Sequence, residues 1–179
     1  MHTVKDDSAD YETELAIVIG KTCKNVSESE ALGYGLGYTA ANNVSSKVAQ
    51  LAQSQAYYSK GFDNACPWGP VLVSAAVVPD PSSFTIRGLK NGEVMQNSSR
   101  GSLMAKLGTS TGMVFNCAKS VSFLSQGTTL PAGTVITTGS PAEIGFCREP
   151  PAYLHDGDEF VVEIWPHIGS LYSVFETEK

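Results

Sequence analysis

The alternation of apolar and polar positions divides this chain into short segments, most of which have the character of strands. An apolar run that ends in glycine predicts a buried strand over residues 11–19. A second apolar run, bounded by prolines, predicts a strand over 70–79, and Asn91-Gly92 predicts the turn of a hairpin over 84–96. Further strands are expected at the start of 38–46, around 135–136, over 159–165 and over 170–176.

Helical patterns are fewer and shorter. A capping box at residues 27–30 predicts a short helix that continues through Leu36, although three glycines weaken it. Residues 113–125 have the pattern of an amphipathic helix, and residues 47–55 are expected to be helical or loop-like. Residues 97–111 are small and polar, which indicates a flexible excursion. The expected fold class is therefore mainly β with short helices (α+β).

Length and composition are those of one globular domain. The chain has 179 residues, of which 42% are hydrophobic and 17% are charged. A chain of this size buries a sizeable core in a single domain. We expect a flexible polar tail at residues 1–10 and one domain over residues 11–179.

The charge and cysteine patterns exclude several classes of function. Eighteen acidic residues against twelve basic ones give a net charge of −6, and no basic run is present, so nucleic acid and anionic membranes are not expected partners. No apolar run approaches the roughly 18 residues that a membrane-spanning helix needs. The four cysteines show no CxxC spacing and the start of the chain is polar. We expect a cytoplasmic protein with reduced thiols.

Two carboxylates, Glu12 and Glu14, stand at the start of the first predicted strand. Alternate residues of a strand project to the same face, so the two backbone positions lie about 6 to 7 Å apart. Like charges at that distance need a solvated strand end, a basic side chain between them or a divalent cation. Taken alone, this segment favours the solvated strand end, because most glutamates are exposed.

Three further polar clusters lie in loops at the ends of predicted strands. They are Asn42-Asn43, the segment around Lys60, and the Gly139-Ser140-Pro141 turn. Each has an ordinary interpretation on its own, as a turn, a solvated lysine or a tight loop. Loops at strand ends are also where binding and catalytic residues concentrate.

Together these segments resemble the fumarylacetoacetate hydrolase family. The resemblance rests on YETELAIVIG, NVSESEALGYGLGYTAANNVSS, SKGFDNACPWGPVLVS, IRGLKNGEVMQ, TLPAGTVITTGSPAEIG and DGDEFVVEI, in the family's order over nearly all of residues 11–175. Within these motifs, the particular residues are similar to those of fungal members of the family. The resemblance implies a mixed β-roll of several sheet layers, a small-molecule substrate and a homodimer.

The family resemblance also implies a metal site. Family members bind Mg²⁺ or Mn²⁺ through a Glu-x-Glu strand and a later aspartate. Glu12 and Glu14 match the first two ligands, and Asn43 stands where the family has the aspartate. An amide oxygen coordinates hard cations but carries no charge, so weaker metal binding is expected.

The same resemblance assigns substrate-binding and catalytic residues. Lys60 matches the active-site lysine, and Glu12 is a second catalytic candidate that also serves as a metal ligand. Family substrates are 2-oxo acids or 1,3-dicarbonyls, whose enolates a metal and a lysine stabilise. The substrate-binding candidates are Gln50, Lys47, Gly139 and Ser140, with Lys47 alternatively a solvated side chain.

Three departures from the family pattern bear on activity. The first is Asn43. The second is that only eleven residues precede Glu12, whereas family members carry a longer segment with a lid that holds a His and Glu pair. The third is Glu143, at a position where the family has glycine, from which a charged side chain would oppose an anionic substrate if it entered the pocket.

Three hypotheses follow. The first is a divalent-metal-dependent enzyme that performs C–C hydrolysis, decarboxylation or isomerisation, repurposed for specialised metabolism. The second is a non-catalytic homologue that acts as a binding protein or partner subunit. The third is a metal-independent enzyme in which Lys60 and Asn43 bind the substrate and Glu12 acts as acid or base. The retained Lys60 and paired carboxylates favour an enzyme.

Overall fold

The computed structural model describes residues 7–98 and 113–177. In this part of the chain the architecture is mainly β with short helices, as the sequence predicts. The strands are β1 (Ala9–Asp10), β2 (Thr13–Ile19), β3 (Gly35–Asn42), β4 (Ser45–Ser46), β5 (Trp68–Ser74), β6 (Thr85–Lys90), β7 (Glu93–Ser98), β8 (Val135–Thr137), β9 (Glu159–Trp165) and β10 (Gly169–Val174). The helices are α1 (Lys47–Leu51), α2 (Tyr57–Lys60) and α3 (Cys117–Ser125), with 3-10 turns η1 (Ala31–Tyr34), η2 (Pro81–Ser83) and η3 (Gly145–Cys147).

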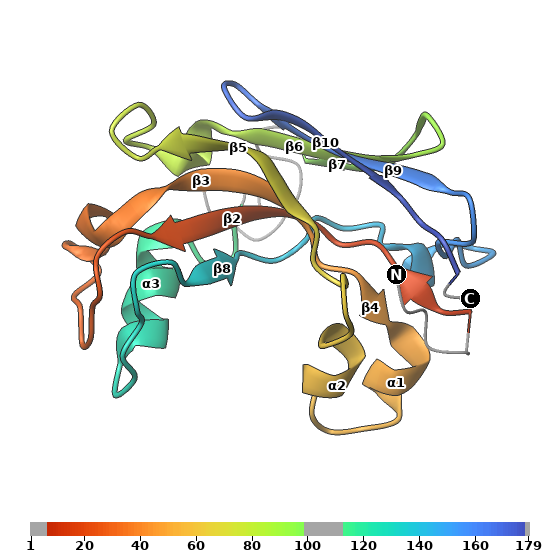
Figure 1. Cartoon of the computed structure of the whole chain (residues 1–179), viewed down its shortest axis with the longest axis horizontal. Helices are drawn as coiled ribbons and strands as arrows, with labels where there is room; N and C mark the ends of the chain where they lie inside the picture. Colours follow the sequence, from red (N-terminus) through yellow and green to blue (C-terminus); the bar gives the residue numbers. More distant parts are fainter. Residues whose placement is uncertain (1–6, 99–112, 178–179) are drawn as a thin grey trace.

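Two four-stranded antiparallel sheets form the body of the molecule (Figure 1). One has the strand order β5-β3-β2-β8 and the other the order β10-β9-β6-β7, while β1 and β4 form a separate two-stranded pair. Helix α3 lies beneath the first sheet near β8, and α1 and α2 lie together beside β4 (Figure 1). Helices α1 and α2 carry residues of the candidate site.

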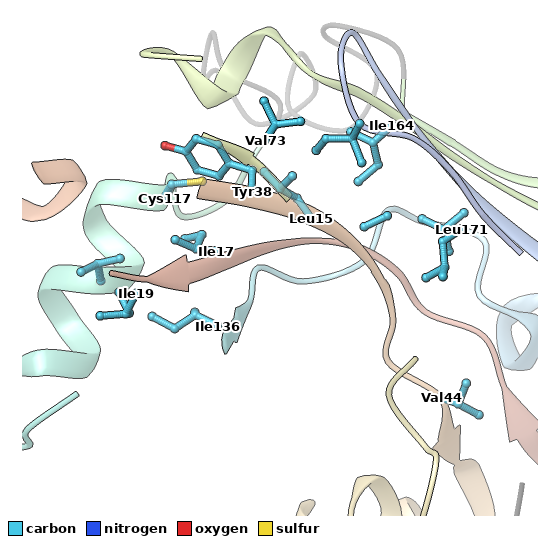
Figure 2. Close-up of a cluster of buried hydrophobic side chains, with 14 of the residues drawn as sticks. Leu15, Ile17, Ile19, Tyr38, Val44, Val73, Cys117, Ile136, Ile164 and Leu171 are labelled. Carbon is cyan, nitrogen blue, oxygen red and sulfur yellow. The ribbon is translucent and has the colours of Figure 1, made fainter. Parts of the chain in front are cut away.

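The hydrophobic core contains residues of both four-stranded sheets and of helix α3. Ile17, Ile19 and Ile136 of the first sheet point toward one another beside α3, where Cys117 lies (Figure 2). The second sheet contributes its own buried residues to the same cluster, including Phe160, Ile164 and Leu171. Strand β2 is buried along its whole length, which accounts for its nearly continuous apolar sequence.

The two sheets approach closely at Gly88 of β6. A Cβ atom at this position would lie 2.2 Å from Oγ1 of Thr13 and 2.7 Å from Cζ of Phe160. Thr13 therefore faces the second sheet. Glu12 and Glu14, which alternate with Thr13, project to the opposite side. This alternation places both carboxylates away from the inter-sheet core.

The helix predicted to run through Leu36 is wrong in length. The Ser27 hydroxyl does bond the Glu30 carboxylate at 2.5 Å, but only the single turn η1 follows, and β3 begins at Gly35. Pairing between strands overrides the local signal here. A Cβ atom at Gly37 would lie 2.1 Å from the Val73 carbonyl oxygen, so this glycine allows the close packing of β3 on β5.

Other elements agree in type and differ in their bounds. The hairpin turn has positive φ at Asn91 (50°) and Gly92 (83°), as a type I′ turn requires. Helix α3 begins only at Cys117, because the Asn116 side chain caps it by accepting from the Lys119 N–H at 2.7 Å. The short helix α2 was not predicted. The excursion predicted at 97–111 lies outside the described residues except for 97–98, which end β7.

The expected tail at residues 1–10 is ordered at its end. Ala9 and Asp10 form β1 and pair with Ser46 and Ser45 of β4. The buried Asp10 carboxylate accepts hydrogen bonds from the Gly145 and Phe146 backbone N–H groups, which holds this segment against a distant loop. Residues 1–6 lie outside the described part. No helix in residues 7–98 and 113–177 is long and apolar enough to cross a membrane.

Candidate active site

Strands β2 and β3 bring the two glutamates beside the Asn42-Asn43 pair. Thr13 pairs with Asn42 in the antiparallel register. The Asn42 side-chain oxygen accepts from the Glu12 N–H at 3.0 Å, and the Glu12 carbonyl accepts from the Asn43 N–H at 2.9 Å. The backbone of Glu12 is thus held on both sides by the end of β3.

The Asn43 amide lies between the two carboxylates. Its Nδ2 atom donates to Oε1 of Glu14 at 2.9 Å and approaches Oε2 of Glu12 at 3.5 Å. The other Glu14 oxygen accepts from the backbone N–H of Gly139 at 2.5 Å. The Gly139 turn therefore contributes a backbone donor to Glu14, while the role of Gly139 in substrate binding stays a prediction.

Two lysines flank Glu12. The Lys60 Nζ atom lies 2.7 Å from Oε2 of Glu12 and 2.5 Å from the Ser45 hydroxyl. The Lys47 Nζ atom lies 2.5 Å from Oε1 of Glu12 and 3.8 Å from the Asp10 carboxylate. Because α1 begins with Lys47 and α2 ends with Lys60, both short helices deliver a cation to the same carboxylate.

The interpretation of Glu12 and Glu14 as a solvated strand end is wrong. Glu14 is 2% exposed and the Glu12 side chain is 13% exposed. Lys47 and Lys60 both contact Glu12, but the group between the two carboxylates is the neutral Asn43 amide, so the second explanation, a basic side chain between them, does not describe the structure either. The alternative that Lys47 is solvated is also wrong, since this residue is 4% exposed.

The environments of the two glutamates move their pKa values in opposite directions. Burial alone would raise the pKa of Glu12, but the hydrogen bonds and charges of Lys47 and Lys60 lower it overall. Burial raises the pKa of Glu14, and the neighbouring Glu12 charge adds to this, although Asn43 and Gly139 oppose it. The pKa values of two adjacent carboxylates are thus shifted in opposite directions, which is a pattern typical of acid–base sites.

Of the remaining residues considered for the site, one lies in the cluster around Glu12 and two do not contact it. Gln50 belongs to the cluster, because its Oε1 atom accepts from Lys47 Nζ at 3.2 Å. The Ser140 hydroxyl instead bonds Gln96 Nε2 at 2.8 Å. Glu143, which was expected to matter if it entered the pocket, is 69% exposed and lies 3.7 Å from Arg148.

Gln96 is a residue of this region that sequence reasoning missed. It is fully buried on β7 and accepts from the Thr13 N–H at 3.0 Å, between the two glutamates. Its Nε2 atom also contacts the carbonyl oxygens of Pro141 at 2.9 Å and Ala142 at 3.3 Å. Gln96 therefore joins the carboxylate strand to the 139–142 turn. The sequence offered one signal for it, namely that this polar residue follows Met95 in a predicted strand.

The donor set at this site suits a hard divalent cation in its chemistry. The carboxylate oxygens of Glu12 and Glu14 converge on the Asn43 amide, and an amide turned about its last torsion offers an oxygen in the same place. In the described ranges, no group of three or more His, Cys, Asp or Glu side chains is placed to hold a metal ion. The site therefore offers two charged oxygen ligands and one neutral ligand.

Comparisons with known proteins point to one family. Residues 3–176 match the family model described as fumarylacetoacetate (FAA) hydrolase C-terminal. Caffeoylpyruvate hydrolase of Neonothopanus nambi is 45% identical over 98% of this chain and 51% of that protein. Oxaloacetate tautomerase YisK of Bacillus subtilis is 34% identical over 95% of this chain and 53% of that protein. The chain thus spans about half the length of these relatives.

Solved structures show the same fold. A fumarylacetoacetate hydrolase from psychrophilic Exiguobacterium antarcticum has a TM-score of 0.84 and 34% identity, covering 96% of this chain and 57% of that chain. Fumarylpyruvate hydrolase from Pseudomonas aeruginosa, solved with Mn²⁺ and pyruvate, has a TM-score of 0.82 over 99% of this chain and 70% of that one. At 22% identity the latter likeness shows the fold alone. By the family model and these relatives together, the chain belongs to the fumarylacetoacetate hydrolase family.

Proposed function

We propose that this chain is a divalent-metal-dependent enzyme that acts on a 2-oxo acid or a 1,3-dicarbonyl-like substrate, by C–C hydrolysis, decarboxylation or isomerisation. The observation that carries the proposal is the position of Lys60, whose ammonium contacts Glu12 and Ser45 beside the second carboxylate. The names of two relatives, a caffeoylpyruvate hydrolase and an oxaloacetate tautomerase, support an oxo-acid substrate.

The roles of the residues follow from charge and position. Lys60 supplies positive charge where an enolate oxygen develops, and its salt bridge to Glu12 holds it there. Glu12 is the candidate acid or base, because it is a largely buried carboxylate at the centre of the cluster, in contact with Lys47 and Lys60. The Ser140 hydroxyl and the N–H groups of its turn are candidate donors to the substrate carboxylate.

Glu12, Glu14 and Asn43 would hold the Mg²⁺ or Mn²⁺ ion. When bound, the ion supplies Lewis-acid polarisation of the substrate carbonyls. Gln50 holds the Lys47 ammonium beside Glu12 through their 3.2 Å hydrogen bond. In this proposal, Lys47 serves substrate binding mainly through its hold on Glu12.

We also propose that the chain forms a homodimer. Two edge strands expose large apolar side chains, with Trp68 of β5 at 52% exposure and Tyr172 of β10 at 65%. Exposed apolar groups on sheet edges favour association between chains. Light scattering on the purified protein tests this, and a monomer at micromolar concentration would refute it. The cytoplasmic location stays a prediction.

The enzyme proposal is tested by turnover. The purified chain is assayed with Mg²⁺ or Mn²⁺ for enolisation and decarboxylation of oxaloacetate and for cleavage of acylpyruvates, all followed by ultraviolet absorbance. Lys60→Met should reduce kcat by about 10²- to 10³-fold, the loss typical of a removed charge-stabilising group. Lys21→Met, at an exposed position outside the cluster, is the matched control. Unchanged turnover in Lys60→Met would refute the assigned role.

A further inference from the structure

Both oxygens of Glu12 are already satisfied by cations of the chain itself. Oε1 receives Lys47 at 2.5 Å and the Ser45 hydroxyl at 3.3 Å. Oε2 receives Lys60 at 2.7 Å and has the Asn43 amide nitrogen at 3.5 Å. A divalent ion at Glu12 would therefore compete with ammonium groups already in contact.

Both oxygens of Glu14 are also satisfied, but by neutral N–H donors and not by a lysine. Its two oxygens accept from Asn43 Nδ2 at 2.9 Å and from the Gly139 N–H at 2.5 Å. Both oxygens of this buried carboxylate are therefore hydrogen-bonded within the chain. The Nδ2 atom of Asn43 contacts both glutamates.

Two ammonium groups offset part of the carboxylate charge around the pair. Lys47 and Lys60 contact Glu12, and Lys47 also lies 3.8 Å from the buried Asp10 carboxylate, so three carboxylates share two ammonium groups. Asparagine adds no charge and places an N–H donor toward each carboxylate. An aspartate at position 43 would instead place an acceptor oxygen near Oε1 of Glu14, and the repulsion would require a cation.

We infer that the Asn43 amide occupies the place of a cation between Glu12 and Glu14, so that this chain keeps its site assembled without a divalent ion and binds one weakly and reversibly. The inference rests on the proposed function in one respect, that a metal would bind at this carboxylate pair. Binding has to break both N–H contacts of Asn43 and gains one fewer charged ligand than an all-carboxylate site.

The inference is tested by stability and binding, without a substrate. Thermal unfolding is measured in EDTA and in millimolar MnCl₂ for wild type, Asn43→Asp and Asn43→Ala. The wild-type Tm should change by less than about 1 °C, because the metal-free site is complete. Asn43→Asp should lose several degrees in EDTA and recover them in MnCl₂. Asn43→Ala should lose Tm in EDTA, since it removes the amide.

Calorimetric titration with MnCl₂ measures affinity directly. Asn43→Asp should bind about tenfold more tightly than wild type or better, because a charged ligand replaces a neutral one. Thr128→Asp adds the same charge at an exposed position after α3 and should leave the wild-type affinity unchanged.

Three results would overturn the inference. They are a wild-type Tm that falls by several degrees in EDTA, an Asn43→Ala variant as stable as wild type in EDTA, and Asn43→Asp binding no tighter than wild type. If Asn43→Asp does not fold, the first two measurements decide. None depends on turnover, so an inactive wild type would refute the proposed function while leaving these outcomes readable.

Discussion

The Gln96→Leu substitution tests whether one buried amide joins the two halves of the site. Leucine has a similar volume but no polar atoms. The change leaves the buried Thr13 N–H without its 3.0 Å acceptor, which costs about 1–3 kcal/mol. It also removes both protons that Nε2 shares among Ser140, Pro141 and Ala142, at about 0.5–1.5 kcal/mol for each bond lost.

The expected total is a loss of about 2–6 kcal/mol in the free energy of unfolding. Urea denaturation followed by tryptophan fluorescence measures it, and at an m-value of about 2 kcal/mol/M the midpoint should fall by about 1–3 M. Ser140→Ala removes only one acceptor of Gln96 and should cost no more than about 1 kcal/mol. A Gln96→Leu loss below about 1 kcal/mol, with an unchanged m-value, would refute the reasoning.

Three further predictions concern stability. Gly88→Ala should destabilise by about 2–3 kcal/mol in urea titrations, because the new methyl would lie 2.2 Å from Thr13 Oγ1; a loss under about 0.5 kcal/mol contradicts the close approach. Glu143→Gly should match or exceed wild-type Tm, since φ is 71°, whereas Glu143→Ala keeps that strain and should not. Burial alone would raise the pKa of Asp158, but its hydrogen bond from Lys90 and its other donors lower it. The ionised Asp158 therefore contributes stability that is fully present above the ordinary pKa of 3.8 and is lost as pH falls through the lower folded-state pKa. Asp158→Asn should have a lower Tm than wild type at pH 7, and the difference should shrink as the pH falls below 3.8.

The part of the site that lies on one strand and its neighbour could be predicted from sequence. Strand alternation places Glu12 and Glu14 on one face, and this follows from backbone geometry alone. Family resemblance placed Asn43 and Lys60 beside them, and the structure has both in contact with Glu12. Turn chemistry likewise determined the Asn91-Gly92 hairpin.

Other features depended on contacts between segments that are distant in the sequence. Asp10 was expected in a tail, yet it is buried because it accepts N–H groups of Gly145 and Phe146, 135 and 136 residues away. Gln96 resembled an ordinary hairpin residue, and only the packing of the two sheets brings it to Thr13. Hydrogen bonds between segments so distant in the sequence produce no local periodicity from which they could be predicted.

The amino-acid sequence by itself determined which segments are extended, where they turn and which side chains share a face. These features follow from interactions between residues that are near neighbours along the chain. Tertiary structure decided that Glu14 and Lys47 are buried, that Ser140 turns to Gln96 and that η1 stays one turn long. Those outcomes depend on desolvation and on partners from another sheet or loop. Their free energies exist only once the sheets have packed.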